Sequence, residues 1–172
     1  MGLEDIKKLR EITLVGINEC KQALADAKGN FDAALRVLRE RGAQVMEKRS
    51  ARATRQGIVD SYIHFGGNLG TLVEVNCETD FVARTDAFKK FVRDVSMHIA
   101  AVSPLYVKRE DIPESIAAGV ANMDEYAKEH CLLEQAYVKD DSMSIGDYLR
   151  NTIAQTGENI VIKRFARFCL GE

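Results

Sequence analysis

The residues best suited to catalysis or metal binding are scattered along the chain. The histidines are His64, His98 and His130, and no two of them have the short spacing of a metal-binding pair. The four cysteines never occur as Cys-x-x-Cys, so neither a zinc ribbon nor a thioredoxin-type site is indicated. Cys77 and His98 could meet in space, but nothing beside them marks an activated thiol. We therefore expect a protein that is not an enzyme and that holds no metal or cofactor.

Two other stretches resemble chemical motifs only superficially. The glycines of "FGGNLG", residues 65–70, fit neither the dinucleotide fingerprint nor the phosphate-binding loop, and they predict a hairpin turn instead. Asp140 and Asp141 are adjacent carboxylates in a turn-like stretch, where solvation or helix capping is the ordinary role. Without a catalytic constellation, the remaining class of function is binding to another protein.

The best candidate for a protein contact lies in "NCETDFVART", residues 76–85. Phe81 stands between Asp80 and Val82, where a strand-like alternation stops and a helix is predicted to begin near Asp86. Its ring either folds back into the core or stands in solvent, ready for a partner. The residues alone leave both interpretations open.

The elements that must position Phe81 can be predicted from periodicity. Residues 1–42 predict three short helices, with Asn18 and Asn30 as N-caps and with Gly29 and Gly42 as the glycines that end them. From residue 57 the period changes to two, and a hairpin, an amphipathic helix over 86–103, acidic helices over 110–135, a helix ending near residue 157 and a final strand over 159–170 follow.

This order predicts an α+β fold. We expect a three-helix, ubiquitin-associated-like module at 1–46, a basic linker at 47–56, and an α+β core of a small antiparallel sheet packed with helices at 57–172. The linker is rich in Lys and Arg, which suits either a solvated connection or a contact with an acidic partner.

Charge and hydropathy narrow the possible partners and location. The net charge is −2, divided as +4 over residues 1–56 and −6 over the rest, so direct nucleic-acid binding is not expected. The first residues lack the apolar region of a secretion signal, and no run is long enough to span a membrane. We expect a cytoplasmic protein that does not bind membranes.

The stretch from Val75 to Arg84 also resembles the signature of the translation elongation factor Ts family, V-N-C-x-T-D-F-V-A-[KR], at every fixed position. "LREITLVGINECKQAL" at 9–24, "MHIAAVSPLYV" at 97–107 and "GENIVIKRFARF" at 157–168 are similar to three further blocks of the family, in the family's order. The chain resembles the short members of this family.

The resemblance implies a function. Family members bind elongation factor Tu and promote release of its GDP, with the phenylalanine of the T-D-F-V motif wedged near the magnesium and phosphate site. Carried over, the wedge is Phe81. The partner-binding residues that the resemblance implies are Asn76, Thr79, Asp80, Phe81, Val82, Lys7, Arg10, Ile17, Asn18, Lys21, His98 and Gly157.

Two further expectations remain. Short members tend to pair, and the long apolar final strand could line the interface of a homodimer, with Cys169 as a possible bridge between the subunits. The alternative function is a ubiquitin-associated-type adaptor module without exchange activity. The T-D-F-V block and the α+β core speak against that alternative.

Overall fold

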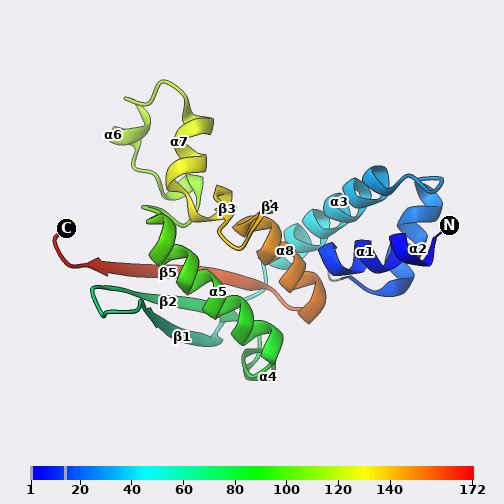
Figure 1. Ribbon diagram of the computed structural model, residues 1–172, viewed down its shortest axis with the longest axis horizontal. Coiled ribbons are helices and arrows are strands. Elements are labelled where there is room, and N and C mark those ends of the chain that lie inside the picture. The colour runs from blue at the N-terminus through cyan, green and yellow to red at the C-terminus, as the bar shows by residue number, and fades with distance from the viewer. Residues whose placement is uncertain (1, 14) are drawn as a thin grey trace.

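The computed structural model describes residues 2–13 and 15–172, except for the side chains of residues 43–49. A module of three helices lies at one end of the molecule, and α3 leads from it into a body of sheet and helices (Figure 1). The module helices are α1 (Leu3–Thr13), α2 (Ile17–Asp26) and α3 (Phe31–Ser50). The three helices pack together as predicted.

The module has a small hydrophobic core of its own. Its buried members are Leu9, Cys20, Ala23, Leu24, Ala34 and Leu38. Gly29 has φ +83 and lies after α2, where its amide donates to the carbonyl of Leu24, so the predicted glycine stop is confirmed. The side chain of Asn30 accepts a hydrogen bond from the amide of Ala33, as an N-cap does.

Two boundaries of the module helices were predicted wrongly. The N-cap of α2 is Gly16, not Asn18, and the Gly16 amide donates to the carboxylate of Glu19 at 3.3 Å. The third helix does not stop at Gly42 but continues to Ser50. A glycine within a helix costs only about 1 kcal/mol relative to alanine, and the packing of α3 against α8 (Ile145–Thr156) offsets that cost.

The body is built on a three-stranded antiparallel sheet. Its strands are β1 (Gln56–Ile63), β2 (Leu69–Cys77) and β5 (Ile160–Cys169), in the order β1-β2-β5. Gly66 and Gly67 both have positive φ in the β1–β2 connection, which confirms the predicted hairpin. Helix α5 (Asp86–Val102) crosses one face of the sheet (Figure 1).

That inner face carries the main hydrophobic core. Val73, Val75 and Cys77 of β2 are fully buried, as are Phe88 and Phe91 of α5. The side chain of Thr71 donates to the carbonyl of Ser96 at 2.9 Å, and this bond ties the strand to the helix. Helix α8 packs against α5 and closes the core.

The opposite face of the sheet has no helix over it among the described residues. Alternate side chains of all three strands lie on this face and are exposed. We call them the uncovered sheet face: Val59, Ile63, Leu72, Val161 and Phe168. Beside them Arg164 donates to Glu74 across the β2–β5 pair at 2.7 Å.

An excursion of small elements connects α5 to α8. It contains η1 (Arg109–Asp111), α6 (Glu114–Ala117), α7 (Met123–His130) and η2 (Leu132–Glu134), then β3 (Ala136–Tyr137) and β4 (Asp140–Ser144). Helices were predicted over 110–135, but the β3–β4 hairpin was not, because β3 is too short to show a period. No helix of the described residues has the length and apolar character needed to cross a membrane.

Candidate partner-binding surface

Phe81 lies on a single helical turn, α4 (Asp80–Ala83), between β2 and α5. Thr79 caps this turn, because its hydroxyl accepts a hydrogen bond from the amide of Val82 at 3.4 Å. Thr85 caps the next helix by accepting from the amide of Phe88. We call residues 78–85 the Phe81 turn. The side chain of Phe81 is 78% exposed, so the ring stands in solvent and does not fold back into the core.

The Phe81 turn is anchored from below by apolar residues. Val82 and Ala83 are buried in the main core, on the side of α4 opposite to Phe81. Val82 is therefore a support of the turn and offers almost no surface to a partner. The arrangement presents one aromatic side chain outward while its two neighbours hold the helix to the body.

Cys77 lies beneath the same turn, and its thiol is not reactive. Its thiol is fully buried and donates to the carbonyl of Thr79 at 3.1 Å. Burial, assisted by the nearby carboxylate of Glu158, raises the pKa of Cys77 to about 11. A thiol with this pKa is protonated at neutral pH, so Cys77 is not an activated nucleophile.

Polar residues flank Phe81 on the exposed side. Asp80 and Arg84 form an ion pair at 2.9 Å, with both side chains mostly in solvent. Asn76 lies one strand residue before Cys77 and donates to Glu74 at 3.2 Å. Of the predicted residues, Thr79 and Asp80 are exposed beside Phe81 on the turn, whereas Asn76 contacts Glu74 on the sheet and Val82 is buried.

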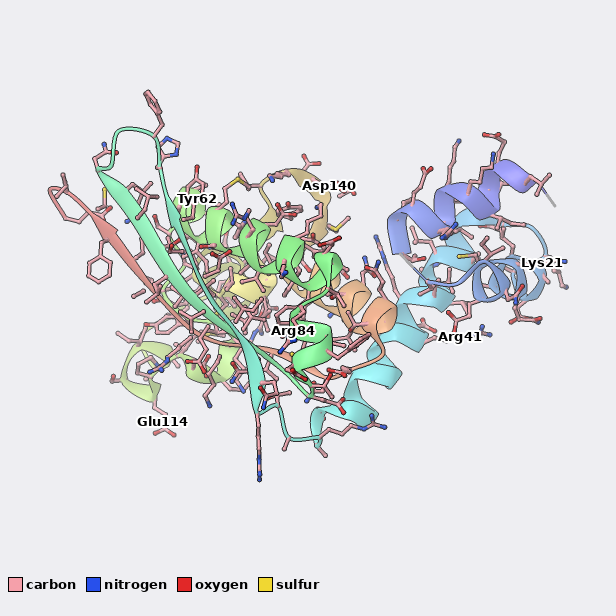
Figure 2. All side chains as sticks on the ribbon, turned by 90° about the horizontal axis from the view of Figure 1, so that it is seen from below. Lys21, Arg41, Tyr62, Arg84, Glu114 and Asp140 are labelled. Atoms are coloured by element: carbon pink, nitrogen blue, oxygen red, sulfur yellow. The ribbon has the colours of Figure 1, made fainter. Side chains whose placement is uncertain are left out.

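The predicted module residues form a separate region. Lys7, Arg10, Asn18 and Lys21 are exposed, and Ile17 is 52% exposed. We call these five residues the module edge. Figure 2 shows Lys21 on the module, well apart from Arg84, which directly follows α4. The structure does not place the module edge next to Phe81, so a partner that contacts both must span the distance between them.

His98 is not on the surface. It is fully buried in α5, where its Nδ1 accepts a hydrogen bond from the amide of Val138 and its Nε2 contacts the Gln135 side-chain oxygen at 3.0 Å. Since an amide always donates, Nδ1 carries no proton and Nε2 donates to Gln135. Burial lowers the pKa of His98, so the ring is neutral. It supports the segment after β3 and has no exposed surface for a partner.

Gly157 is the C-cap of α8, with φ +78. It directly precedes Glu158 and Asn159, which contact the Phe81 turn: Glu158 accepts from both the amide and the hydroxyl of Thr79. These contacts were missed from the sequence, because they join residues that are 79 positions apart. The only available signal was that "GEN" opens one of the blocks similar to the family.

A second polar cluster was also missed. The buried carboxylate of Asp94 accepts hydrogen bonds from Lys90, Lys139 and the hydroxyl of Tyr148. Burial works to raise the pKa of Asp94, but the three hydrogen bonds outweigh it and the pKa is lowered. The cluster joins α5, the β3–β4 hairpin and α8. No group of His, Cys, Asp or Glu side chains suited to a metal ion occurs in the described part of the chain.

Comparison with known proteins decides the family. The model of the family described as "Elongation factor TS" matches residues 4–122 and 114–172. The chain belongs to the elongation factor Ts family. Elongation factor Ts of Thermoanaerobacter sp. (strain X514) is 44% identical over 195 residues, covering 100% of this chain and 96% of that protein. Elongation factor Ts of Desulfosudis oleivorans is 46% identical over 190 residues, covering 97% and 96%.

A third relative, elongation factor Ts of Thermotoga maritima, is 40% identical over 193 residues, covering 100% of this chain and 97% of that protein. An elongation factor Ts is a nucleotide-exchange factor for elongation factor Tu and not an enzyme. The resemblance of the Val75–Arg84 block and the prediction of a non-enzymatic protein are therefore both confirmed.

Proposed function

We propose that this chain releases GDP from elongation factor Tu by inserting Phe81 near the magnesium and phosphate site of that GTPase. The observation that carries the proposal is the 78% exposure of Phe81 on a turn that Val82 and Ala83 anchor in the core. A large apolar side chain held in water on a fixed support is well suited to enter a partner. The match of Val75–Arg84 to the family motif supports the same role.

Phe81 cannot supply the whole effect. Weakening bound nucleotide a thousandfold requires about 4 kcal/mol of coupling between the two ligands, since each tenfold is about 1.4 kcal/mol. Burying one phenylalanine side chain gives roughly 1.5–3 kcal/mol. The module edge and the polar residues around Phe81 must therefore contribute the rest of the coupling free energy. By linkage, GDP weakens binding of the exchange factor as much as the factor weakens binding of GDP.

In this proposal, three of the predicted site residues do not contact the partner directly. Val82 and His98 are buried, and Gly157 ends the helix whose next two residues contact the Phe81 turn. Val82 and Gly157 help to hold the Phe81 turn in place, whereas His98 supports the segment after β3. The direct contacts are made by Asn76, Thr79, Asp80 and Phe81 on the body and by the module edge.

We also propose that the chain forms a homodimer through the uncovered sheet face. Its five apolar side chains are exposed on a sheet that is well covered on the other side. The Glu74–Arg164 pair neutralises the charge on this face, so a second copy can pack on it without leaving an unpaired charge. Cys169 is partly exposed at the end of β5, but its register partner is Leu69, so its side chain lies on the covered side of the sheet and an intersubunit disulfide is not expected across this face.

Light scattering tests the dimer. We expect twice the chain mass for the wild type, and the chain mass for Leu72→Asp, which places a charge in the centre of the uncovered sheet face. A strict monomer of the wild type at micromolar concentration would refute this part of the proposal. Electrophoresis under denaturing conditions, with and without a reductant, tests for a Cys169 bridge, because only a covalent dimer keeps twice the chain mass there.

The exchange proposal is tested with elongation factor Tu loaded with a fluorescent GDP analogue. Adding this protein in the presence of excess unlabelled GDP should accelerate loss of the signal, with a rate that saturates as its concentration rises. No acceleration would sink the proposal. Binding without acceleration would favour the adaptor alternative. We place the reaction in the cytoplasm, with no direct contact to nucleic acid or membrane.

A further inference from the structure

The turn that carries Phe81 is too small to hold its own shape. Helix α4 has four residues, and one isolated helical turn is unstable because its nucleation fixes several dihedral angles for a single hydrogen bond. Phe81 is exposed and contributes little packing to the turn. The orientation of the ring must therefore be fixed by groups outside α4.

The carboxylate of Glu158 is the most direct of these groups. One of its oxygens accepts from the amide of Thr79 at 3.0 Å, and the other accepts from the Thr79 hydroxyl at 2.6 Å. Thr79 is the N-cap of α4, so its own hydroxyl oxygen is already committed to the amide of Val82. Glu158 thus binds both donors of the residue from which α4 begins.

The contact is reciprocal. While Glu158 binds Thr79, the amide of Asn159 donates to the carboxylate of Glu78 at 2.6 Å. The positive φ of Gly157 reverses the chain after α8 and brings the two residues to the turn. We call Glu78, Thr79, Glu158 and Asn159 the carboxylate clasp.

The linker from the module ends on the same clasp. Arg52 pairs with the carboxylate of Glu78 at 3.4 Å, and the side-chain amide of Asn159 donates to the carbonyl of Arg52 at 3.0 Å. The clasp therefore joins three parts of the chain: the linker, the Phe81 turn and the α8–β5 corner. Packing of Val82 in the core holds the turn against the body, and the hydrogen bonds of the clasp hold the orientation of the turn on the body.

We propose that Glu158 is the positioning residue for Phe81, so that its carboxylate presents the ring in the orientation that enters the GTPase. This inference rests on the proposed function of Phe81. A clasped turn is ordered before binding, so less of the binding free energy is lost in ordering it and more is available to expel nucleotide. Without Glu158 the turn keeps its apolar anchor but samples several directions, and the ring enters less often.

The chain contains a matched control for this chemistry. At the start of α8, Asp147 accepts from both the amide and the hydroxyl of the N-cap Ser144, at 3.0 and 2.8 Å. Asp147→Ala removes the corresponding pair of hydrogen bonds at the start of α8, together with the ion pair between Asp147 and Arg150. A general loss of stability affects both variants, whereas a loss of Phe81 positioning affects only Glu158→Ala.

The first experiment observes the turn without any partner. The chain has no tryptophan, so Phe81→Trp creates a single tryptophan at the wedge, which can be excited at a wavelength where the tyrosines do not absorb. We expect the fluorescence anisotropy of this tryptophan to fall when Glu158→Ala is added and to stay unchanged when Asp147→Ala is added. Equal anisotropy in all three proteins would overturn the proposal.

The second experiment measures GDP release at saturating exchange factor. Loss of one N-cap interaction changes an equilibrium by about two- to thirtyfold, so we expect Glu158→Ala to lower the maximal rate about fivefold. Glu158→Gln, which keeps one acceptor, should be intermediate, and it carries the test if Glu158→Ala does not fold. In a Phe81→Ala background, Glu158→Ala should cause no further loss of rate.

The outcomes separate the two proposals. If Phe81→Ala exchanges as fast as the wild type, the wedge is wrong and the role of Glu158 is overturned with it. If Phe81→Ala is slow but Glu158→Ala loses no more than Asp147→Ala, the wedge stands and only the positioning role is overturned. A fivefold loss confined to Glu158→Ala and absent without Phe81 supports the positioning role.

Discussion

The Phe81 turn and the module edge are two parts of one proposed contact surface, but they are held in different ways. The turn is fixed on one side by Glu158 and Asn159, which are distant in sequence, and from beneath by its own buried Val82. The module is closed by its own small core, and Asn151 of α8 donates to the carbonyl of Ile12 across the joint with the body.

This difference in how the two regions are held suggests that they contribute to different steps of exchange. A turn that is ordered in the free protein loses little conformational entropy on binding. Most of the binding free energy of its contact is therefore available to weaken the binding of nucleotide. Lys7, Arg10 and Lys21 are exposed ionic side chains on the module, and such charges contribute mainly to encounter and to affinity. The turn should set the maximal rate of exchange, and the module edge should set the concentration at which that rate is reached.

The largest effect is expected for Phe81→Ala. Losing a contact worth roughly 1.5–3 kcal/mol should lower the maximal rate of GDP release about 10- to 150-fold, while thermal stability changes little because the ring is exposed in the free protein. Stopped-flow release of fluorescent GDP and a thermal melt check both parts.

Phe65→Ala is the matched control for that prediction. Phe65 lies at the tip of the β1–β2 hairpin and is 96% exposed, but it is not on the Phe81 turn. It should exchange at the wild-type rate. A Phe81→Ala protein that loses several kcal/mol of stability would show instead that the ring is part of the core.

A smaller effect is expected from the module edge. Lys21→Glu should raise the half-saturating concentration several-fold and leave the maximal rate unchanged, because an exposed charge pair is worth about 0.2–1 kcal/mol and its reversal adds repulsion. The difference from the wild type should shrink as salt is increased. Lys28→Glu, on the same module after α2, serves as the control. A lower maximal rate for Lys21→Glu would contradict the proposal that the two regions contribute to different steps of exchange.

The sequence predicts the turn and the module edge unequally well. The three helices, the hairpin and α8 follow from periodicity, caps and glycines, all of which are local signals. The exposure of Phe81 does not, because an aromatic residue between Asp80 and Val82 fits either a buried or an exposed site, and only the family motif favoured exposure. The clasp is beyond local reasoning, since Glu158 finds Thr79 only after the sheet has formed.

The errors have the same origin. Asn18 is a good N-cap by type, but the module core sets where α2 begins, and that point is Gly16. Gly42 is a good helix stop by type, but packing of α3 on α8 keeps the helix going. His98 matched a family position and was expected at the surface, although its burial depends on the unpredicted β3–β4 hairpin that packs over it.

Lowering the pH should reduce the free energy of unfolding of the sheet-and-helix body, because that body contains His98. The three-helix module contains no histidine. Because the folded-state pKa of His98 is lowered below its unfolded value, its neutral form is favoured by folding. This contribution is fully present above pH 6.5 and is lost as the pH falls below 6.5, by up to about 1.4 kcal/mol per pH unit. Urea unfolding followed by circular dichroism at pH 7.0 and 5.5 measures the loss.

His98→Asn is the informative variant for that measurement. Its side-chain oxygen can still accept from the amide of Val138 but cannot be protonated, so the protein should be less stable at pH 7 and should lose less on acidification. The prediction fails if His98→Asn and the wild type lose the same free energy between the two pH values.

The mildest test compares the two regions without any substitution. Cys20 in the module and Cys77 under the Phe81 turn are both fully buried, and burial raises the pKa of each thiol. Labelling of either thiol therefore requires local opening. A module of about 40 residues is marginal by itself, so we expect Cys20 to be labelled faster than Cys77 at pH 8, as read by mass spectrometry of peptides. The comparison should be repeated at pH 9. If opening controls both thiols, their order must persist, and a reversed order would mean that the Phe81 turn is the looser of the two regions.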